Sequence, residues 1–251
     1  MNVNTNLQNN LTMGQLFYKG LKLTVLIFFF SNTVMDNQLF GQKIMLGKEV
    51  RMLALGDSYT IGESVETKMR WPHQFIDALR KTGKDAHLPD YIATTGWTTR
   101  DLLSGIANSL NREKDYNLVS ILIGVNNQYQ GLDITIYEPG LRNIIDQAID
   151  ITDRDTARVF LISIPDYAFT PFGKGDKIIS SEIDSYNEIN RRVALEYGIL
   201  RVDITPISRR GIEEPRLSAC LGCPWQRWAR RADDDRPDLC DRAGGRRDPL
   251  F

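Results

Sequence analysis

Histidine and cysteine are scarce in this chain, which has two residues of the first type and three of the second. His73 and His87 are interpreted as surface histidines, so the sequence shows no evident general base of the commonest kind. Cys220, Cys223 and Cys240 all lie in the last 34 residues, so the rest of the chain can form no disulfide of its own. A zinc site or redox pair at Cys220 and Cys223 is disfavoured, because structural zinc needs four ligands and no histidine lies nearby.

The chain also lacks a strong net charge and a long apolar run. Its formal net charge is −1 at pH 7, so no global field favours nucleic acid or an anionic membrane as a partner. The main apolar run, residues 23–30, is too short for a membrane-spanning helix, which needs about 20 residues. With 251 residues, 42% of them hydrophobic, the chain fits one globular α/β domain with extensions.

Residues 1–45 are expected to form a leader that carries a signal peptide. Lys19 and Lys22 precede the apolar run 23–30, which gives the positive and apolar segments of a secretory signal. No clean cleavage site with small residues follows between 31 and 42, so a buried or disordered leader is the alternative. We therefore expect export to the periplasm or the medium, with a cytoplasmic location as the alternative.

Residues 46–217 alternate between short apolar runs and longer amphipathic stretches. Such alternation predicts a parallel sheet with right-handed crossovers, and therefore an α/β fold with a three-layer α/β/α sandwich around a five-stranded sheet. The long helix should turn Ile183, Tyr186, Ile189, Val193 and Leu195 mostly inward. The expected strands are 50–55, 91–94, 118–123, 159–164 and 200–202, and the expected helices are 71–81, 100–111, 139–150 and 178–197.

Small and amide residues follow three of these expected strands. Gly56-Asp57-Ser58 ends the first run, Gly96 follows the second, and Gly124-Val125-Asn126-Asn127 ends the third. Open α/β sheets place their ligands at the carboxyl ends of the strands, so Ser58, Gly96 and Asn126 should meet at one edge. The plainer alternative is that each is a turn residue or a helix cap.

Taken together and in this order, the three blocks resemble those of the SGNH/GDSL hydrolases, a family of serine esterases and lipases that includes lysophospholipases. The resemblance covers roughly residues 50–217 and implies a flavodoxin-like strand order, 2-1-3-4-5. It implies that Ser58 is the nucleophile of an acyl-enzyme mechanism on a carboxylic ester. It also implies that the Ser58 N–H, the Gly96 N–H and the Asn126 amide form the oxyanion hole. No metal or cofactor is implied, and the expected partner is a small-molecule ester.

The sequence departs from this family where the base and acid should lie. The family places them together as Asp-x-x-His near the C-terminus, and no such pattern occurs in this chain. Asp57 is not a good substitute for the acid, because its side chain and that of its neighbour Ser58 should diverge. We therefore expect that a protein with this sequence does not hydrolyse esters.

Residues 218–251 form an aberrant tail of different composition. They hold no Ile, Val, Lys, Thr, Asn or Glu but seven Arg and six Asp, and they show no helical or strand periodicity. The change falls where the last block of the family should begin, which suggests a reading-frame slip near Ser218. Reading one base later through residues 222–224 permits Asp-x-His, one residue short of the family spacing. A naturally divergent tail is the alternative.

The main alternative from another functional class is a catalytically dead module that binds acyl groups or glycans on the same fold. A sugar-nucleotide or flavin binder is weaker, because no Gly-x-Gly-x-x-Gly or Walker pattern follows the first expected strand. The acyl and alcohol specificity and the oligomeric state cannot be inferred from the sequence.

Overall fold

The computed structural model describes residues 44, 46–111, 114–170 and 172–210. The expected signal segment, the tail from residue 218 and its three cysteines lie outside these residues. In the part of the chain that is described, no helix combines the length and the apolar character needed to cross a membrane.

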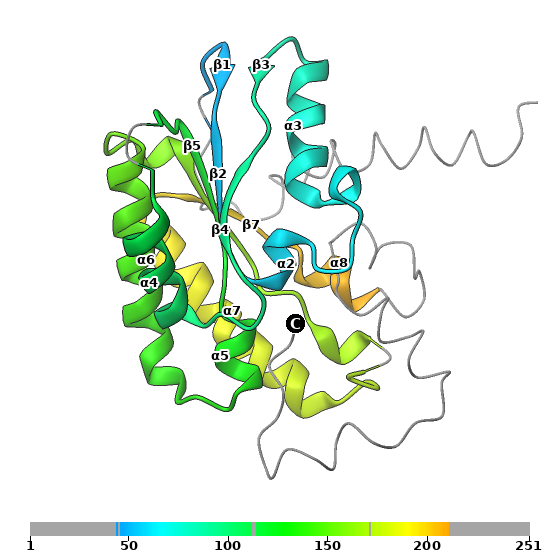
Figure 1. Ribbon diagram of the computed structural model, residues 1–251. Helices are drawn as coiled ribbons and strands as arrows, with labels where there is room; N and C mark the ends of the chain where they lie inside the picture. The colour runs from blue at the N-terminus through cyan, green and yellow to red at the C-terminus, as the bar shows by residue number, and fades with distance from the viewer. Residues whose placement is uncertain (1–43, 45, 112–113, 171, 211–251) are drawn as a thin grey trace, which may run out of the picture. The chain divides into compact units, whose positions relative to one another are not determined.

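A five-stranded parallel sheet forms the centre of the domain (Figure 1). Its strands lie in the order β4-β2-β5-β6-β7, which confirms the predicted order 2-1-3-4-5. Every residue of β2, β5 and β6 is buried, as expected for strands covered on both faces. The strands are β2 (Met52–Gly56), β4 (Asp90–Ala93), β5 (Leu118–Leu122), β6 (Val159–Ile162) and β7 (Leu200–Val202).

The first predicted strand, residues 50–55, is wrong in one respect, because the chain breaks it at Arg51. β1 (Glu49–Val50) pairs in parallel with β3 (Asp85–Ala86) in a separate two-stranded sheet, and β2 begins only at Met52. The Arg51 N–H donates to the side-chain oxygen of Asn117 at 2.9 Å. The Asn117 amide in turn donates to the Glu49 carbonyl at 3.0 Å, so one side chain pairs with both the Arg51 N–H and the Glu49 carbonyl.

Helices cover both faces of the central sheet. α4 (Thr99–Ser109), α6 (Tyr137–Ile151) and α7 (Lys177–Tyr197) pack side by side on one face, and α3 (Trp71–Lys81) lies on the other (Figure 1). Three short helices follow strands directly: α2 (Ser58–Ile61), α5 (Val125–Tyr129) and α8 (Thr205–Arg209). Single 3-10 turns occupy Thr67–Met69, Ile134–Ile136, Thr156–Arg158 and Tyr167–Phe169.

The helix boundaries agree with the periodicity to within about two residues. Thr98 caps α4 through a reciprocal capping box with Asp101. The expectation that Leu195 faces inward is wrong, since its side chain is 49% exposed. Leu195 lies two residues after the buried Val193, and residues two apart on a helix do not share a face.

Candidate functional site

Three loops meet beside one another at the carboxyl edge of the sheet, as the sequence predicted. Gly56, the last residue of β2, is paired in register with Ala93 of β4 and Leu122 of β5. Ser58, Gly96 and Asn126 follow these aligned residues by two, three and four positions. The carboxyl ends of adjacent parallel strands thus bring the three segments together, at the end of the sheet opposite to β1 and β3 (Figure 1).

The tight turn before Ser58 depends on Gly56. A Cβ at Gly56 would lie 2.3 Å from the Leu122 carbonyl oxygen and 2.1 Å from the Thr60 hydroxyl, so no other residue fits. Asp57 caps α2, because its Oδ1 accepts from the Tyr59 N–H at 2.9 Å. Ser58 is the first residue of that helix, and the first N–H groups of a helix have no intrahelical acceptor.

The loop that carries Gly96 turns through a left-handed backbone conformation. Gly96 has φ of +81°, which a glycine adopts without the clash that a Cβ causes. The Trp97 N–H donates to the Thr94 carbonyl at 3.3 Å and closes the turn. Among the residues that the structure describes, none accepts a hydrogen bond from the Gly96 N–H. This donor therefore fits the predicted role in an oxyanion hole.

Asn126 is fully buried at the start of α5, and its amide is fixed by the neighbouring loop. Its Nδ2 donates to the Trp97 carbonyl at 3.0 Å. An amide NH₂ has two hydrogens, so this bond orients the group and leaves the second hydrogen for another acceptor. Asn127 holds the same loop further on, where its Oδ1 accepts from the Thr99 N–H and its Nδ2 donates to the Thr99 hydroxyl, each at 3.0 Å.

Buried polar atoms without a partner concentrate at this edge. Six such side-chain atoms occur among the described residues, and three of them are Asp57 Oδ2, Ser58 Oγ and Asn126 Oδ1. The others belong to Trp71, Ser120 and Gln128. An unpaired buried polar group costs about 1–3 kcal/mol, so native proteins keep few of them. Three of the six lie at this one sheet edge, which makes it the candidate functional site.

The carboxyl group of Asp57 is buried and forms no ion pair with any residue that the structure describes. Burial, the largest cause, raises the pKa of Asp57 from 3.8 to about 7, although the hydrogen bond from the Tyr59 N–H opposes the rise. Asp57 is 1% exposed. The carboxyl group next to Ser58 thus holds its proton to a much higher pH than an exposed aspartate does.

Both histidines are engaged elsewhere. His73, in the first turn of α3, has Nδ1 at 2.8 Å from the Tyr91 hydroxyl, and burial, the largest cause, lowers its pKa. It is half-buried, so its interpretation as a simple surface residue is wrong. His87 is exposed and has Nε2 at 2.9 Å from Glu49 in β1, at the amino end of the sheet. Neither histidine is hydrogen-bonded to Ser58.

Sequence reasoning missed several side chains that hold this edge. The Thr95 hydroxyl donates to Glu63 at 2.8 Å, and the Gln130 amide donates to the Gly96 carbonyl at 3.0 Å. Each contact joins residues more than 30 positions apart, and no sequence motif indicates either contact. A third missed group is an aromatic cluster in which ring centroids lie 6.0–6.1 Å apart, formed by Tyr129, Tyr167 and Phe172.

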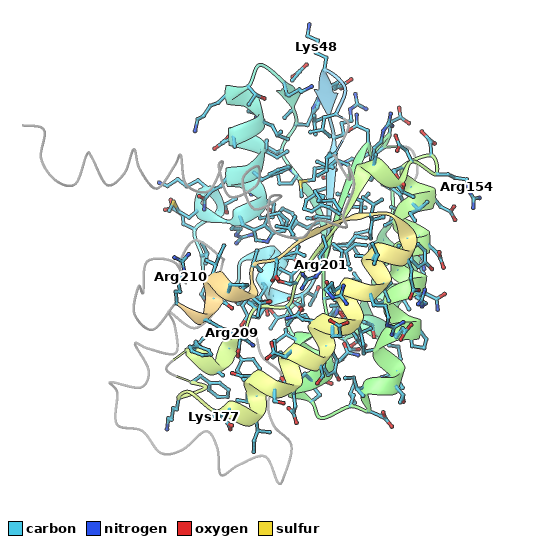
Figure 2. All side chains as sticks on the ribbon, turned by 180° about the vertical axis from the view of Figure 1, so that it is seen from behind. Lys48, Arg154, Lys177, Arg201, Arg209 and Arg210 are labelled. Atoms are coloured by element: carbon cyan, nitrogen blue, oxygen red, sulfur yellow. The ribbon has the colours of Figure 1, made fainter. Side chains whose placement is uncertain are left out.

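A polar cluster joins the ends of β6 and β7 at the same edge. The Ser163 hydroxyl donates to Asp203 at 2.9 Å and accepts from the Ile204 and Thr205 N–H groups at 2.8 and 3.1 Å. α8 starts at Thr205. Figure 2 shows Arg209 and Arg210 at the end of α8, toward the opposite end of the domain from Lys48.

The sequence from residue 54 to residue 241 matches the model of a family described as the GDSL-like Lipase/Acylhydrolase family. The match contains all three blocks around Ser58, Gly96 and Asn126 and reaches into the tail. No curated protein matches the chain.

Solved structures of similar fold include a lipase/acylhydrolase from Enterococcus faecalis, with 17% identity and a TM-score of 0.53. That match covers 66% of this chain and 82% of the other. The acetyl xylan esterase AlAXEase also shows 17% identity and a TM-score of 0.53, over 66% and 84% of the two chains. A point mutant of the esterase AlinE4 shows 18% identity and a TM-score of 0.52, over 77% and 100%. At these identities the likeness establishes the fold.

Proposed function

Because the chain belongs to the GDSL-like lipase/acylhydrolase family, we propose that it is built to cleave carboxylic esters through an acyl-enzyme on Ser58. The observation that carries this proposal is the group of unpaired polar atoms at the carboxyl edge. Ser58 Oγ is buried without a hydrogen-bond partner, and the Gly96 N–H and the second Asn126 N–H each lack an acceptor in the described part of the chain. A tetrahedral oxyanion would supply the missing acceptor.

The reaction follows from these groups. Ser58 Oγ passes its proton to a base and attacks the ester carbonyl carbon, the Oγ–C bond forms, and negative charge develops on the carbonyl oxygen. Donation from the Ser58 N–H, the Gly96 N–H and the Asn126 amide stabilises that charge. One such donor contributes about 2.7–4 kcal/mol of transition-state stabilisation. The C–O bond to the alcohol then breaks, the alcohol takes the serine proton from a base, and water later hydrolyses the acyl-enzyme.

The sequence offers no histidine that is available as the base for this reaction. His73 is bonded to Tyr91 and His87 to Glu49, and the chain has no further histidine. We therefore propose that ester cleavage by this chain is slow. A catalytically dead module that retains acyl or glycan binding is the second candidate, and the engagement of both histidines favours it.

Hydrolysis of p-nitrophenyl acetate by the full chain and by Ser58→Ala distinguishes the two candidates. Faster hydrolysis by the wild-type protein supports the serine hydrolase, however slow the absolute rate. Equal rates, combined with binding of acyl or glycan ligands to both proteins, would favour the binding module.

A further inference from the structure

The short helix α5 holds the Gly96 loop through three side chains. Asn126 donates to the Trp97 carbonyl, Asn127 binds the backbone and hydroxyl of Thr99, and Gln130 Nε2 donates to the Gly96 carbonyl at 3.0 Å. Gly96, Trp97 and Thr99 of the loop are thus each paired with a side chain from α5 or from the residue that follows it. Asn126 and Asn127 belong to the family block, but Gln130 does not.

Gly96 needs such a restraint more than another residue would. Glycine populates positive and negative φ about equally, so the peptide groups on either side of it rotate easily. The turn closed by the Trp97 N–H fixes the start of the loop, and the contact between Thr95 and Glu63 fixes its flank. Gln130 is the side chain that holds the carbonyl of Gly96 itself.

We propose that Gln130 is a positioning residue, whose amide holds the Gly96 carbonyl so that the Gly96 N–H keeps pointing toward an oxyanion on Ser58. This inference rests on the proposed function of the same site. Gln130 lies at the surface, at the C-terminal end of α5, and acts only through Gly96. It touches neither the ester nor the nucleophile.

The probe for this role is phenylboronic acid, which forms a tetrahedral, negatively charged adduct on a serine oxygen. Such an adduct resembles the transition state and places an oxyanion against the donors. Its affinity for the full chain should fall by about five- to tenfold in Gln130→Ala, the effect of one misplaced hydrogen bond. Exchange of the Trp97 amide hydrogen, which belongs to the same peptide group as the Gly96 carbonyl and donates to the Thr94 carbonyl, should accelerate in the same variant, as measured by NMR.

Two further variants separate positioning from a merely structural role. Gln130→Arg keeps a donor with the necessary reach and should retain both the boronate affinity and the slow exchange of the Trp97 amide. Gln128→Ala removes a second glutamine of α5, whose amide donates to Glu182 of α7 rather than to the loop. It should lower the unfolding temperature and leave the boronate affinity near that of the wild type.

The role of Gln130 is overturned if Gln130→Ala leaves the exchange of the Trp97 amide unchanged, or if both glutamine variants lose boronate affinity equally. Failure of the proposed function has a different signature. A wild-type protein that binds the boronate no better than Ser58→Ala would contradict the serine hydrolase itself.

Discussion

Asp57 makes the stability of the domain depend on pH in an unusual direction. Its pKa in the folded protein, about 7, lies above the ordinary value of 3.8 because burial disfavours the charged form. Between these two values the unfolded chain binds fewer protons than the folded one, so the stability falls as pH rises from about 4 to 7. One pKa unit corresponds to about 1.4 kcal/mol, which puts the full loss on the order of 4 kcal/mol.

Asp57→Asn should remove this dependence, because asparagine caps a helix about as well as aspartate but carries no charge. We expect the variant to match the wild type below pH 4 and to unfold at higher urea concentration above pH 7. Urea titrations at pH 4, 6 and 8 measure the effect. An equal difference between the two proteins at all three values would show that the Asp57 carboxyl does not titrate in this range.

Gly96→Ala should damage the site beyond the strain that it introduces. Alanine at φ of +81° costs about 1–2 kcal/mol, and relief of that strain would turn the loop and its N–H. Gly83→Ala is the matched control, because Gly83 has φ of +86° and open space around it in the turn after α3. Both variants should lose similar stability in thermal unfolding, whereas only Gly96→Ala should lose boronate affinity. Equal boronate affinities in the two variants would contradict a role for Gly96 in the oxyanion hole.

At the scale of secondary-structure elements, four charged side chains fasten α6 to α7. Arg142 bonds Glu138 at 2.8 Å and Glu196 at 2.5 Å, and Arg192 bonds the same two carboxylates at 2.5 and 3.3 Å. Hydrogen bonds from Arg192 and then Arg142 lower the pKa of Glu138 to about 2. This stabilisation is present above the ordinary pKa near 4.5 and is lost as pH falls toward 2.

Glu138→Gln should lower the unfolding temperature at pH 7 by only a few degrees, because the group is near the surface and screened. Calorimetry at low and high salt checks this, and salt should reduce the difference. Glu188→Gln removes an ion pair with Arg191 inside α7 and should have a smaller effect. A loss in Glu138→Gln that is unaffected by salt would point to packing rather than charge.

Local patterns predicted the elements and the sheet edge, because periodicity and glycine positions are properties of short segments. The break at Arg51 was not predictable, since the Asn117 side chain that causes it comes from 66 residues away. The contact of Gln130 with Gly96 likewise spans 34 residues and leaves no trace in either local sequence. The sequence did predict one common edge for Ser58, Gly96 and Asn126, because each follows a strand by a few residues.

At the scale of the whole molecule, the leader leads to a prediction about export. Lys19, Lys22 and the apolar run 23–30 favour a secretory signal, so the mature chain should begin between about 31 and 45. N-terminal sequencing of the protein secreted by a bacterial host measures this. An intact Met1 or Met13 on protein from the cytoplasm would contradict it.

The tail leads to a second prediction at this scale. A chain whose codons after Leu217 are shifted and repaired to give Asp-x-x-His should hydrolyse p-nitrophenyl acetate faster than the printed chain by orders of magnitude. The gain should vanish when the restored histidine is replaced by alanine. The printed chain would keep at most the contribution of the oxyanion hole and binding, roughly 10³–10⁴ over water. Equal rates in the two chains would mean that the base lies elsewhere.

The polar cluster of Ser163, Asp203 and Thr205 has a consequence for how such a domain can change. It anchors the start of α8 to the ends of two strands, so the chain leaves Arg210 from the edge that also carries Ser58. A base and acid placed after residue 210 would therefore start from the end of the sheet where the nucleophile lies.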